Sequence, residues 1–110
     1  MKNLLFVYGT LRRSLSGKDH PFLRGNAHYV AGGKARGALL KQTEYPALIR
    51  SPFKEAWVTG KIYRLEDPAL LLPFLDAYEG EDYSRVPDTV LMHDRPLEAW
   101  VYLYRPLEIE

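Results

Sequence analysis

The segment from Glu98 to Arg105 is the stretch that most limits the folds open to this chain, because it is apolar on both of its faces. Alternate side chains of a strand point to opposite sides. One side carries Trp100, Tyr102 and Tyr104, and the other carries Ala99, Val101 and Leu103. Both faces are therefore expected to be at least partly buried, which fits a small barrel filled by its own side chains and flanked outside by a helix. The aromatic face could line a pocket, but core packing is the favoured interpretation.

The remainder of the chain is mostly a series of short strand candidates punctuated by glycine and proline. The expected strands are residues 4–8, 27–31, 35–41, 47–50 and 58–65, then 83–92 with an interruption at Pro87-Asp88, and a turn follows at 93–96. Gly60 marks either a bulge or a place where another group approaches the backbone closely. A chain of 110 residues fits one compact domain. We therefore predict a single domain over residues 1–110 with an α+β fold, a small mixed-strand β-barrel with flanking short helices.

A helix is expected between Asp67 and Gly80. Asp67 can accept hydrogen bonds from free amides at a helix start, and Pro68 suits the first helical position. Gly80 is typical of a C-terminal cap. Apolar residues recur between these ends at helical spacing, and they are Leu70, Leu71, Phe74, Leu75 and Tyr78. Pro73 removes one backbone hydrogen bond, so it is expected to kink the helix or to split it into two short pieces.

The composition excludes several classes of chemistry and partner. The chain has no cysteine, so it has no disulfide, thiol nucleophile or thiolate metal site. Its three histidines lack the close spacing of metal ligands. Fifteen basic and 14 acidic residues leave a net charge of +1, which argues against a nucleic-acid partner. The apolar runs are too short to cross a bilayer and no signal-peptide cleavage pattern follows the first of them, so we expect a cytoplasmic protein.

The first strand stops at a glycine, in the sequence Val7-Tyr8-Gly9-Thr10-Leu11. Gly9 can take a positive φ at no steric cost, so the amides of Gly9, Thr10 and Leu11 could converge on one point as an anion-binding nest. Such a nest would hold a carboxylate or a developing oxyanion. A strand followed by an ordinary tight turn has the same pattern, so both interpretations stay open at this point.

A second candidate site lies where the expected helix ends. A helix C-terminus carries partial negative charge, and Asp76, Glu81 and Asp82 lie close in sequence. The ionised form of Glu79 should therefore be disfavoured. Enzymes use such settings to bring a glutamate into the range of proton transfer near neutral pH. A solvated acidic loop would show the same cluster, and the residue types alone do not decide between the two.

These two stretches resemble the signatures of the γ-glutamylcyclotransferase-like family, which includes γ-glutamylamine cyclotransferases. Residues 7–13 (VYGTLRR) are similar to its N-terminal motif, and residues 75–80 (LDAYEG) with Tyr83-x-Arg85 are similar to its second motif. Weaker family elements occur in the expected order at residues 37–40, 45–48, 60–65, 67–68 and 99–102. The resemblance therefore covers nearly the whole chain.

The resemblance implies a cofactor-free acyl-transfer or lyase reaction in which Glu79 is the catalytic acid/base. The substrate's own α-amine attacks its γ-carbonyl, closes 5-oxoproline and expels the attached amine or amino acid. The protein therefore needs no nucleophile of its own. Its main tasks are to hold the substrate in the conformation that cyclises and to transfer protons. The amides of Gly9, Thr10 and Leu11 would hold the substrate's α-carboxylate or the oxyanion.

Four further side chains are candidates for substrate binding. Tyr8, Tyr83 and Tyr102 could orient the substrate through their hydroxyls. Arg85 could pair with a substrate carboxylate or with Asp76, and the pairing with Asp76 is slightly favoured. The sequence alone does not choose between these roles.

The expected partner is a small-molecule γ-glutamyl substrate, with no nucleic acid, no membrane, no metal and no cofactor. The chain is expected to be a monomer or a weak homodimer. Two alternatives stay open. One is a non-catalytic module of the same fold that binds a small anion, and the other is an enzyme that removes a γ-glutamyl group from a biosynthetic intermediate.

Overall fold

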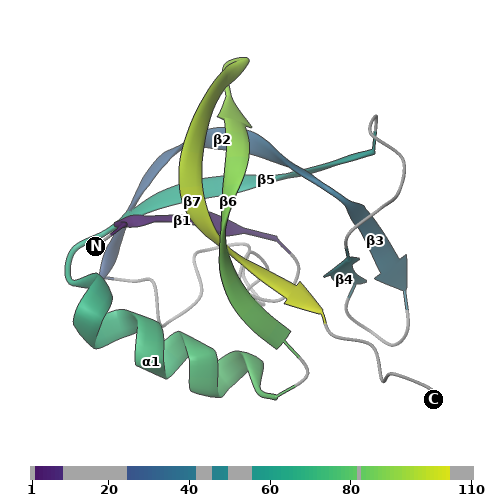
Figure 1. The fold of residues 1–110 in the computed structure, drawn as a ribbon. Helices are drawn as coiled ribbons and strands as arrows, with labels where there is room; N and C mark the ends of the chain where they lie inside the picture. The colour runs from purple at the N-terminus through teal and green to yellow at the C-terminus, as the bar shows by residue number, and fades with distance from the viewer. Residues whose placement is uncertain (1, 9–24, 42–45, 50–55, 82, 105–110) are drawn as a thin grey trace.

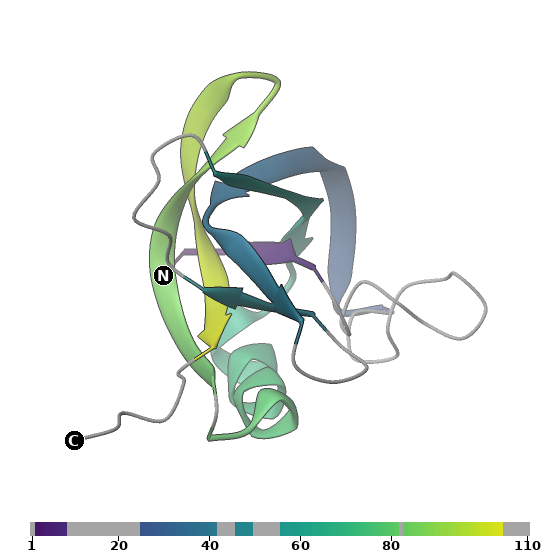
Figure 2. The same ribbon diagram turned by 90° about the vertical axis from the view of Figure 1, so that its right-hand side faces the viewer.

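The computed structural model describes residues 2–8, 25–41, 46–49, 56–81 and 83–104. Its elements are β1 (Leu4–Val7), β2 (Ala27–Arg36), β3 (Ala38–Lys41), β4 (Pro46–Ile49), β5 (Trp57–Leu65), α1 (Pro68–Glu79), β6 (Tyr83–Met92) and β7 (Arg95–Tyr104). The strands β1, β5, β2, β6 and β7 close into a barrel, and β3 pairs with β4 in a separate two-stranded sheet (Figures 1 and 2). The α+β barrel is confirmed, although the described residues contain one helix where several short ones were predicted.

The barrel is mixed because one of its strand pairs is parallel. β1 runs antiparallel to β5 and parallel to β7, where Leu5 lies opposite Trp100. β2 pairs antiparallel with β5 and β6, and β6 pairs antiparallel with β7. The β6–β7 hairpin turns through His93 and Asp94, whose φ values of 51° and 64° belong to a two-residue turn that matches the twist of the strands. Pairing of β1 with β7 thus brings two distant parts of the chain together.

Two apolar clusters lie on opposite sides of the barrel wall. The interior cluster contains Phe6, Ala35, Leu48, Val58, Ile62, Val90, Ala99, Val101 and Leu103. The cluster between the wall and α1 contains Leu5, Val7, Tyr63, Leu65, Leu71, Leu72, Leu75 and Tyr102. Strand alternation produces this division, because consecutive residues of β1 enter different clusters. α1 therefore covers the outer face of the barrel wall (Figure 1).

β7 contributes to both clusters, as its two apolar faces predicted. Ala99 and Val101 are fully buried in the interior cluster. Tyr102 is 2% exposed beneath α1, and Trp100 packs against the same cluster. Burial of both faces is thus confirmed, and the aromatic face belongs chiefly to the core.

α1 has the ends that its flanking residues predicted. It begins at Pro68 and ends at Glu79. The Asp67 side chain accepts a hydrogen bond from the Leu70 amide at 3.3 Å, which satisfies one of the free donors at the helix start. Gly80 follows as the C-terminal cap with a φ of 86°, a conformation that glycine adopts without steric cost.

Pro73 was predicted to kink or to split the helix, and the split is wrong because α1 is continuous over 12 residues, while the kink stays a prediction. Pro73 leaves the carbonyl of Ala69 without its helical donor. Both residues are exposed, so water can supply that hydrogen bond.

In the part of the chain that the structure describes, no helix is long and apolar enough to cross a membrane. The cytoplasmic location stays a prediction.

Two predicted strand breaks are also wrong. β2 continues through Gly32 and Gly33, and β6 continues through Pro87. A Cβ at Gly33 would lie 2.5 Å from Cδ1 of Ile62, so this glycine makes room for an interior side chain instead of ending its strand. Pro87 lies outside the part of β6 that pairs with β2, so its missing donor leaves that pairing intact.

Gly60 of β5 is a close-approach position, which was one of the two interpretations of this residue. A Cβ there would lie 2.5 Å from the Val7 carbonyl oxygen and 2.6 Å from Cζ of Phe6. The register shift that marks a bulge lies instead in β2, between Tyr29 and Ala31. Gly60 thus lets β5 pass close to β1 around the buried ring of Phe6.

We expect Gly60→Ala to lower the free energy of unfolding by about 1–3 kcal/mol, because the new methyl group must displace a backbone carbonyl as well as a ring. The matched control is Gly32→Ala in the same wall, where the new Cβ would meet its nearest atom at an ordinary 3.7 Å. That control should change stability by less than about 0.5 kcal/mol. Urea unfolding followed by circular dichroism measures both, and equal stabilities would contradict the close approach.

Candidate active site

Glu79 is the last residue of α1, and its side chain is partly buried. Burial raises the pKa of its carboxyl from 4.5 to about 7. The sequence predicted the direction of this change but attributed it to the helix C-terminus and to neighbouring acids, whereas the cause is the loss of hydration on burial. At neutral pH the acid and base forms of Glu79 are therefore present in comparable amounts, which suits a group that transfers protons.

Tyr8 follows β1 directly and reaches the same region. Its hydroxyl donates a hydrogen bond to the Tyr102 carbonyl oxygen at 2.6 Å and accepts one from the Leu48 amide at 3.0 Å. Burial raises the pKa of Tyr8, and the negative charge of Glu79 contributes to the rise. The end of β1 and the end of α1 therefore lie close together, although they are far apart in the sequence.

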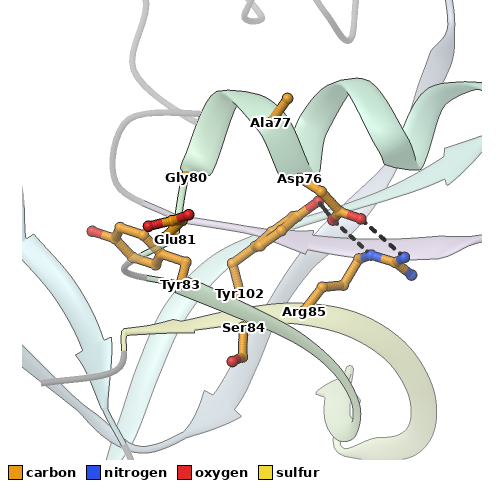
Figure 3. Close-up of a pocket in the computed structure, with 8 residues that line it drawn as sticks. All are labelled: Asp76, Ala77, Gly80, Glu81, Tyr83, Ser84, Arg85 and Tyr102. Atoms are coloured by element: carbon orange, nitrogen blue, oxygen red, sulfur yellow. Dashed lines mark hydrogen bonds and ion pairs between the residues drawn. The ribbon is translucent and has the colours of Figure 1, made fainter.

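Asp76, one helical turn before Glu79, is held by two side chains of the β6–β7 hairpin. Arg85 donates from Nε to Oδ1 at 2.8 Å and from Nη2 to Oδ2 at 3.1 Å. The Tyr102 hydroxyl donates to Oδ1 at 2.6 Å. Arg85 and Tyr102 are cross-strand neighbours, and Figure 3 shows both side chains converging on the carboxylate. We call Asp76, Arg85 and Tyr102 the Asp76 clamp.

The clamp keeps Asp76 ionised. Burial alone would raise the pKa of Asp76, but the hydrogen bonds from Arg85 and Tyr102 lower it below its usual value. Burial, the hydrogen bond to Asp76 and the charge of Asp76 raise the pKa of Tyr102, and Glu79 adds to the rise. The Tyr102 hydroxyl therefore stays protonated as a donor. The pKa values of two carboxyl groups one turn apart are thus shifted in opposite directions, downward for Asp76 and upward for Glu79.

Trp100 supports the clamp from the side of β7. The guanidinium carbon of Arg85 lies 4.3 Å from the centroid of the indole ring, a distance at which a cation is attracted to the aromatic face. The indole N–H donates to the Lys2 carbonyl oxygen at 3.0 Å. The Arg85 guanidinium is therefore held by its hydrogen bonds to Asp76 and by its contact with the Trp100 ring, which is itself hydrogen-bonded to the backbone of Lys2.

An open pocket of about 620 Å³ lies beside the clamp. It is lined by residues from the end of α1 and from β6 and β7, and these are Asp76, Ala77, Gly80, Glu81, Tyr83, Ser84, Arg85 and Tyr102 (Figure 3). Its volume is in the range of small-molecule sites. Glu79 is not among the described residues that line this pocket, although its neighbour Gly80 is. The pocket therefore lies next to the residue that carries the raised pKa without being lined by it.

The structure brings together part of the predicted site. The charge of Glu79 contributes to the raised pKa of both Tyr8 and Tyr102. Tyr83 lines the same pocket as Tyr102, and its ring packs edge-on against Tyr104 with centroids 5.6 Å apart. The structure places Arg85 in the pairing with Asp76 that the sequence slightly favoured. The predicted nest of residues 9–11 lies outside the described residues, so it stays a prediction.

Sequence reasoning missed the supporting residues of this site. For Trp100 the favoured prediction was core packing, with a pocket lining as the alternative, and neither included the contact of its ring with the Arg85 guanidinium. The three-residue spacing of Asp76 and Glu79 was the one available signal, because side chains at that spacing share a helix face.

Within the described ranges, no group of three or more histidine, aspartate or glutamate side chains could hold a metal ion. Cofactor-free chemistry stays a prediction.

The sequence matches a family model described as gamma-glutamyl cyclotransferase, AIG2-like, over residues 5–110. YkqA of Bacillus subtilis, which is provisionally named a gamma-glutamylcyclotransferase, is 31% identical over 67 residues, and the match covers 61% of this chain and 24% of YkqA. The crystal structure of YkqA has a TM-score of 0.74 at 25% identity over 94% of this chain. This chain covers only 36% of the YkqA chain in that comparison.

Two further solved structures have the same architecture. An AIG2-like protein from Mus musculus has a TM-score of 0.72 at 26% identity, with 92% of this chain and 76% of the mouse chain covered. A structure named gamma-glutamyl cyclotransferase has a TM-score of 0.66 at 14% identity, with 96% of this chain and 68% of the other covered. The second likeness concerns the fold alone. Together these comparisons agree with the barrel and helix described above.

Proposed function

The chain belongs to the gamma-glutamyl cyclotransferase, AIG2-like family, and on that premise we propose that it releases 5-oxoproline from a γ-glutamyl amine or a γ-glutamyl peptide. One observation carries the proposal. Glu79, where the family resemblance expects the catalytic acid/base, is partly buried and has a pKa raised to about 7. Since the chain spans about a third of YkqA, the activity is proposed for this chain and is not transferred from that whole protein.

The proposed reaction requires one proton-transfer group. The substrate α-amine attacks the γ-carbonyl carbon, a new C–N bond closes the five-membered ring, and the bond to the leaving nitrogen breaks. Glu79 in its ionised form accepts a proton from the α-ammonium group and then donates it to the leaving nitrogen. The attacking nitrogen loses a second proton as it becomes the lactam N–H, and the departing amine takes up this proton and leaves as an ammonium ion. Intramolecular attack removes most of the entropic cost of bringing the two reacting groups together, so the reaction needs no protein nucleophile. Glu79 is again in its ionised form at the end of each cycle.

The neighbouring groups have supporting roles in this proposal. Tyr8 and Tyr83 stay candidates for orienting the substrate. The amides of Gly9, Thr10 and Leu11 stay candidates for binding the α-carboxylate or the oxyanion. Asp76 is held ionised by its donors, so Glu79 is the carboxyl group at the end of α1 that is suited to exchange a proton near neutral pH.

Purified protein incubated with γ-glutamyl-ε-lysine, γ-glutamyl amino acids or glutathione should release 5-oxoproline from at least one of them, as measured by mass spectrometry. The matched control is the N-acetylated form of each substrate, which cannot cyclise because its α-nitrogen is no longer nucleophilic. No product from any free-amine substrate at high protein concentration would contradict the proposal. Binding of a substrate without turnover would instead identify the non-catalytic module.

A further inference from the structure

The Asp76 clamp fixes the turn of α1 that carries Glu79. Residues three positions apart in a helix are neighbours on its surface. The three hydrogen bonds to the Asp76 carboxylate attach this turn to β6 and β7. The carbonyl of Asp76 also accepts the hydrogen bond from Gly80 that ends the helix, at 3.0 Å. Backbone and side chain of Asp76 thus both hold the turn that carries Glu79.

The geometry of the clamp is more specific than that of an ordinary surface ion pair. The side chains of Arg85 and Asp76 are 24% and 42% exposed, and most ion pairs between exposed side chains contribute little to stability because their geometry is not fixed. Their contact nevertheless joins both oxygens of the carboxylate to two nitrogens of the guanidinium, a bidentate arrangement that fixes orientation. The hydroxyl of Tyr102 then adds a third donor. Three donors that fix the direction of the Asp76 carboxylate suit the placement of a reacting group on the same turn.

We infer that Asp76, Arg85 and Tyr102 are positioning residues for the proposed proton transfer. They hold the end of α1 against the β6–β7 hairpin, so that Glu79 stays partly buried. This inference rests on the proposed function, because it assigns the clamp a role in that reaction. In this role the clamp acts on the reaction through Glu79.

Loosening the clamp should expose Glu79, and exposure should return its pKa toward 4.5, because burial is what raises it. The titratable and charged groups that the described elements bring to this end of α1 are Asp76 on the helix itself, Tyr8 after β1, Glu81 after the helix, Tyr83 and Arg85 on β6, and Tyr102 on β7. A test must therefore loosen the clamp without changing the net charge around Glu79.

Two variants satisfy that condition. Tyr102→Phe removes one neutral donor and keeps the ring in its cluster. Asp76→Asn combined with Arg85→Gln removes one negative and one positive charge. The matched controls are Tyr29→Phe on β2, where the side chain is 56% exposed, and Lys2→Gln combined with Glu98→Gln, which removes a separate ion pair of 3.2 Å.

The first measurement follows the Glu79 carboxyl directly by carbon-13 NMR titration, with its signal assigned by its absence from Glu79→Gln. The titration midpoint should lie near pH 7 in the wild type and in both controls, and it should fall by at least about one pH unit in both clamp variants. An unchanged midpoint in the clamp variants would overturn the inference. This measurement does not depend on turnover.

The second measurement is turnover per folded molecule. Both clamp variants should lower kcat about tenfold with KM within about twofold, since a small displacement of a reacting group is enough for such a loss. A raised KM with kcat retained would overturn the inference in favour of substrate binding by these side chains. An unchanged kcat per folded molecule would reduce the clamp to a structural role. Absence of product from the wild type would refute the proposed function, while the titration would still decide whether the clamp controls Glu79.

Discussion

Glu79→Gln is expected to lower kcat for 5-oxoproline release by about 10²- to 10⁴-fold, because glutamine keeps the size of the side chain but cannot transfer a proton. KM should change by less than about twofold, since the proposal gives Glu79 no role in binding the ground state. The matched control is Glu98→Gln on β7, whose side chain is 61% exposed, and its turnover should equal that of the wild type. Wild-type turnover by Glu79→Gln would remove the basis of the proposed mechanism.

The pH dependence of the same reaction provides a second readout of Glu79. The proposed base is the ionised form, and burial raises the pKa of this carboxyl to about 7. In the wild type, kcat/KM should therefore increase with pH up to about 7, by close to tenfold per pH unit on the acidic side. Glu79→Gln should lack this limb. A wild-type limb near pH 4.5 would show instead that the reacting carboxyl is exposed.

The features that the sequence predicted correctly are those set by neighbouring residues. Alternation in β7 is local, so residues 99–103 were assigned to two buried faces before any strand pairing was known. The helix ends follow from Asp67 and Gly80, which act within one turn of the backbone. Both effects have short range. A single sequence is sufficient to read them.

The features that the sequence failed to predict depend on contacts between distant residues. Gly33 reads as a strand break in the sequence, whereas its small size accommodates the side chain of Ile62 on the neighbouring strand. The raised pKa of Glu79 was predicted from adjacent acids, but burial causes it, and burial depends on how α1 packs on the barrel. The second partner of Asp76, the Tyr102 hydroxyl, also comes from a strand that lies far along the chain. Packing of this kind has no local signature.

Glu79 should make the protein less stable as pH rises, and Glu79→Gln should remove that effect. The pKa of this carboxyl is about 7 in the folded state against 4.5 as its ordinary value, so the folded state binds the proton more tightly. The contribution of Glu79 is therefore fully favourable below pH 4.5 and is lost as pH rises through about 7. The difference between these two pKa values corresponds to about 3 kcal/mol at pH 8.

Urea unfolding of the wild type and of Glu79→Gln at pH 4.5 and pH 8 measures this contribution. The variant should gain about 2–3 kcal/mol of stability relative to the wild type between the two pH values. The lowered pKa of Asp76 affects stability in the opposite direction at low pH, but it is common to both proteins and cancels in the difference. Glu98→Gln removes the same charge from an exposed site and should show no such gain.

A variant that is more stable at pH 8 and yet inactive would separate the two consequences of burying Glu79. Loss of turnover could not then result from unfolding, because more of the variant than of the wild type would be folded. Burial of an acid that weakens the fold and raises its pKa toward neutrality is typical of residues kept for catalysis at the expense of stability. A stability difference that is the same at both pH values would contradict this account, since the Glu79 carboxyl would then be equally hydrated in the folded and unfolded chain.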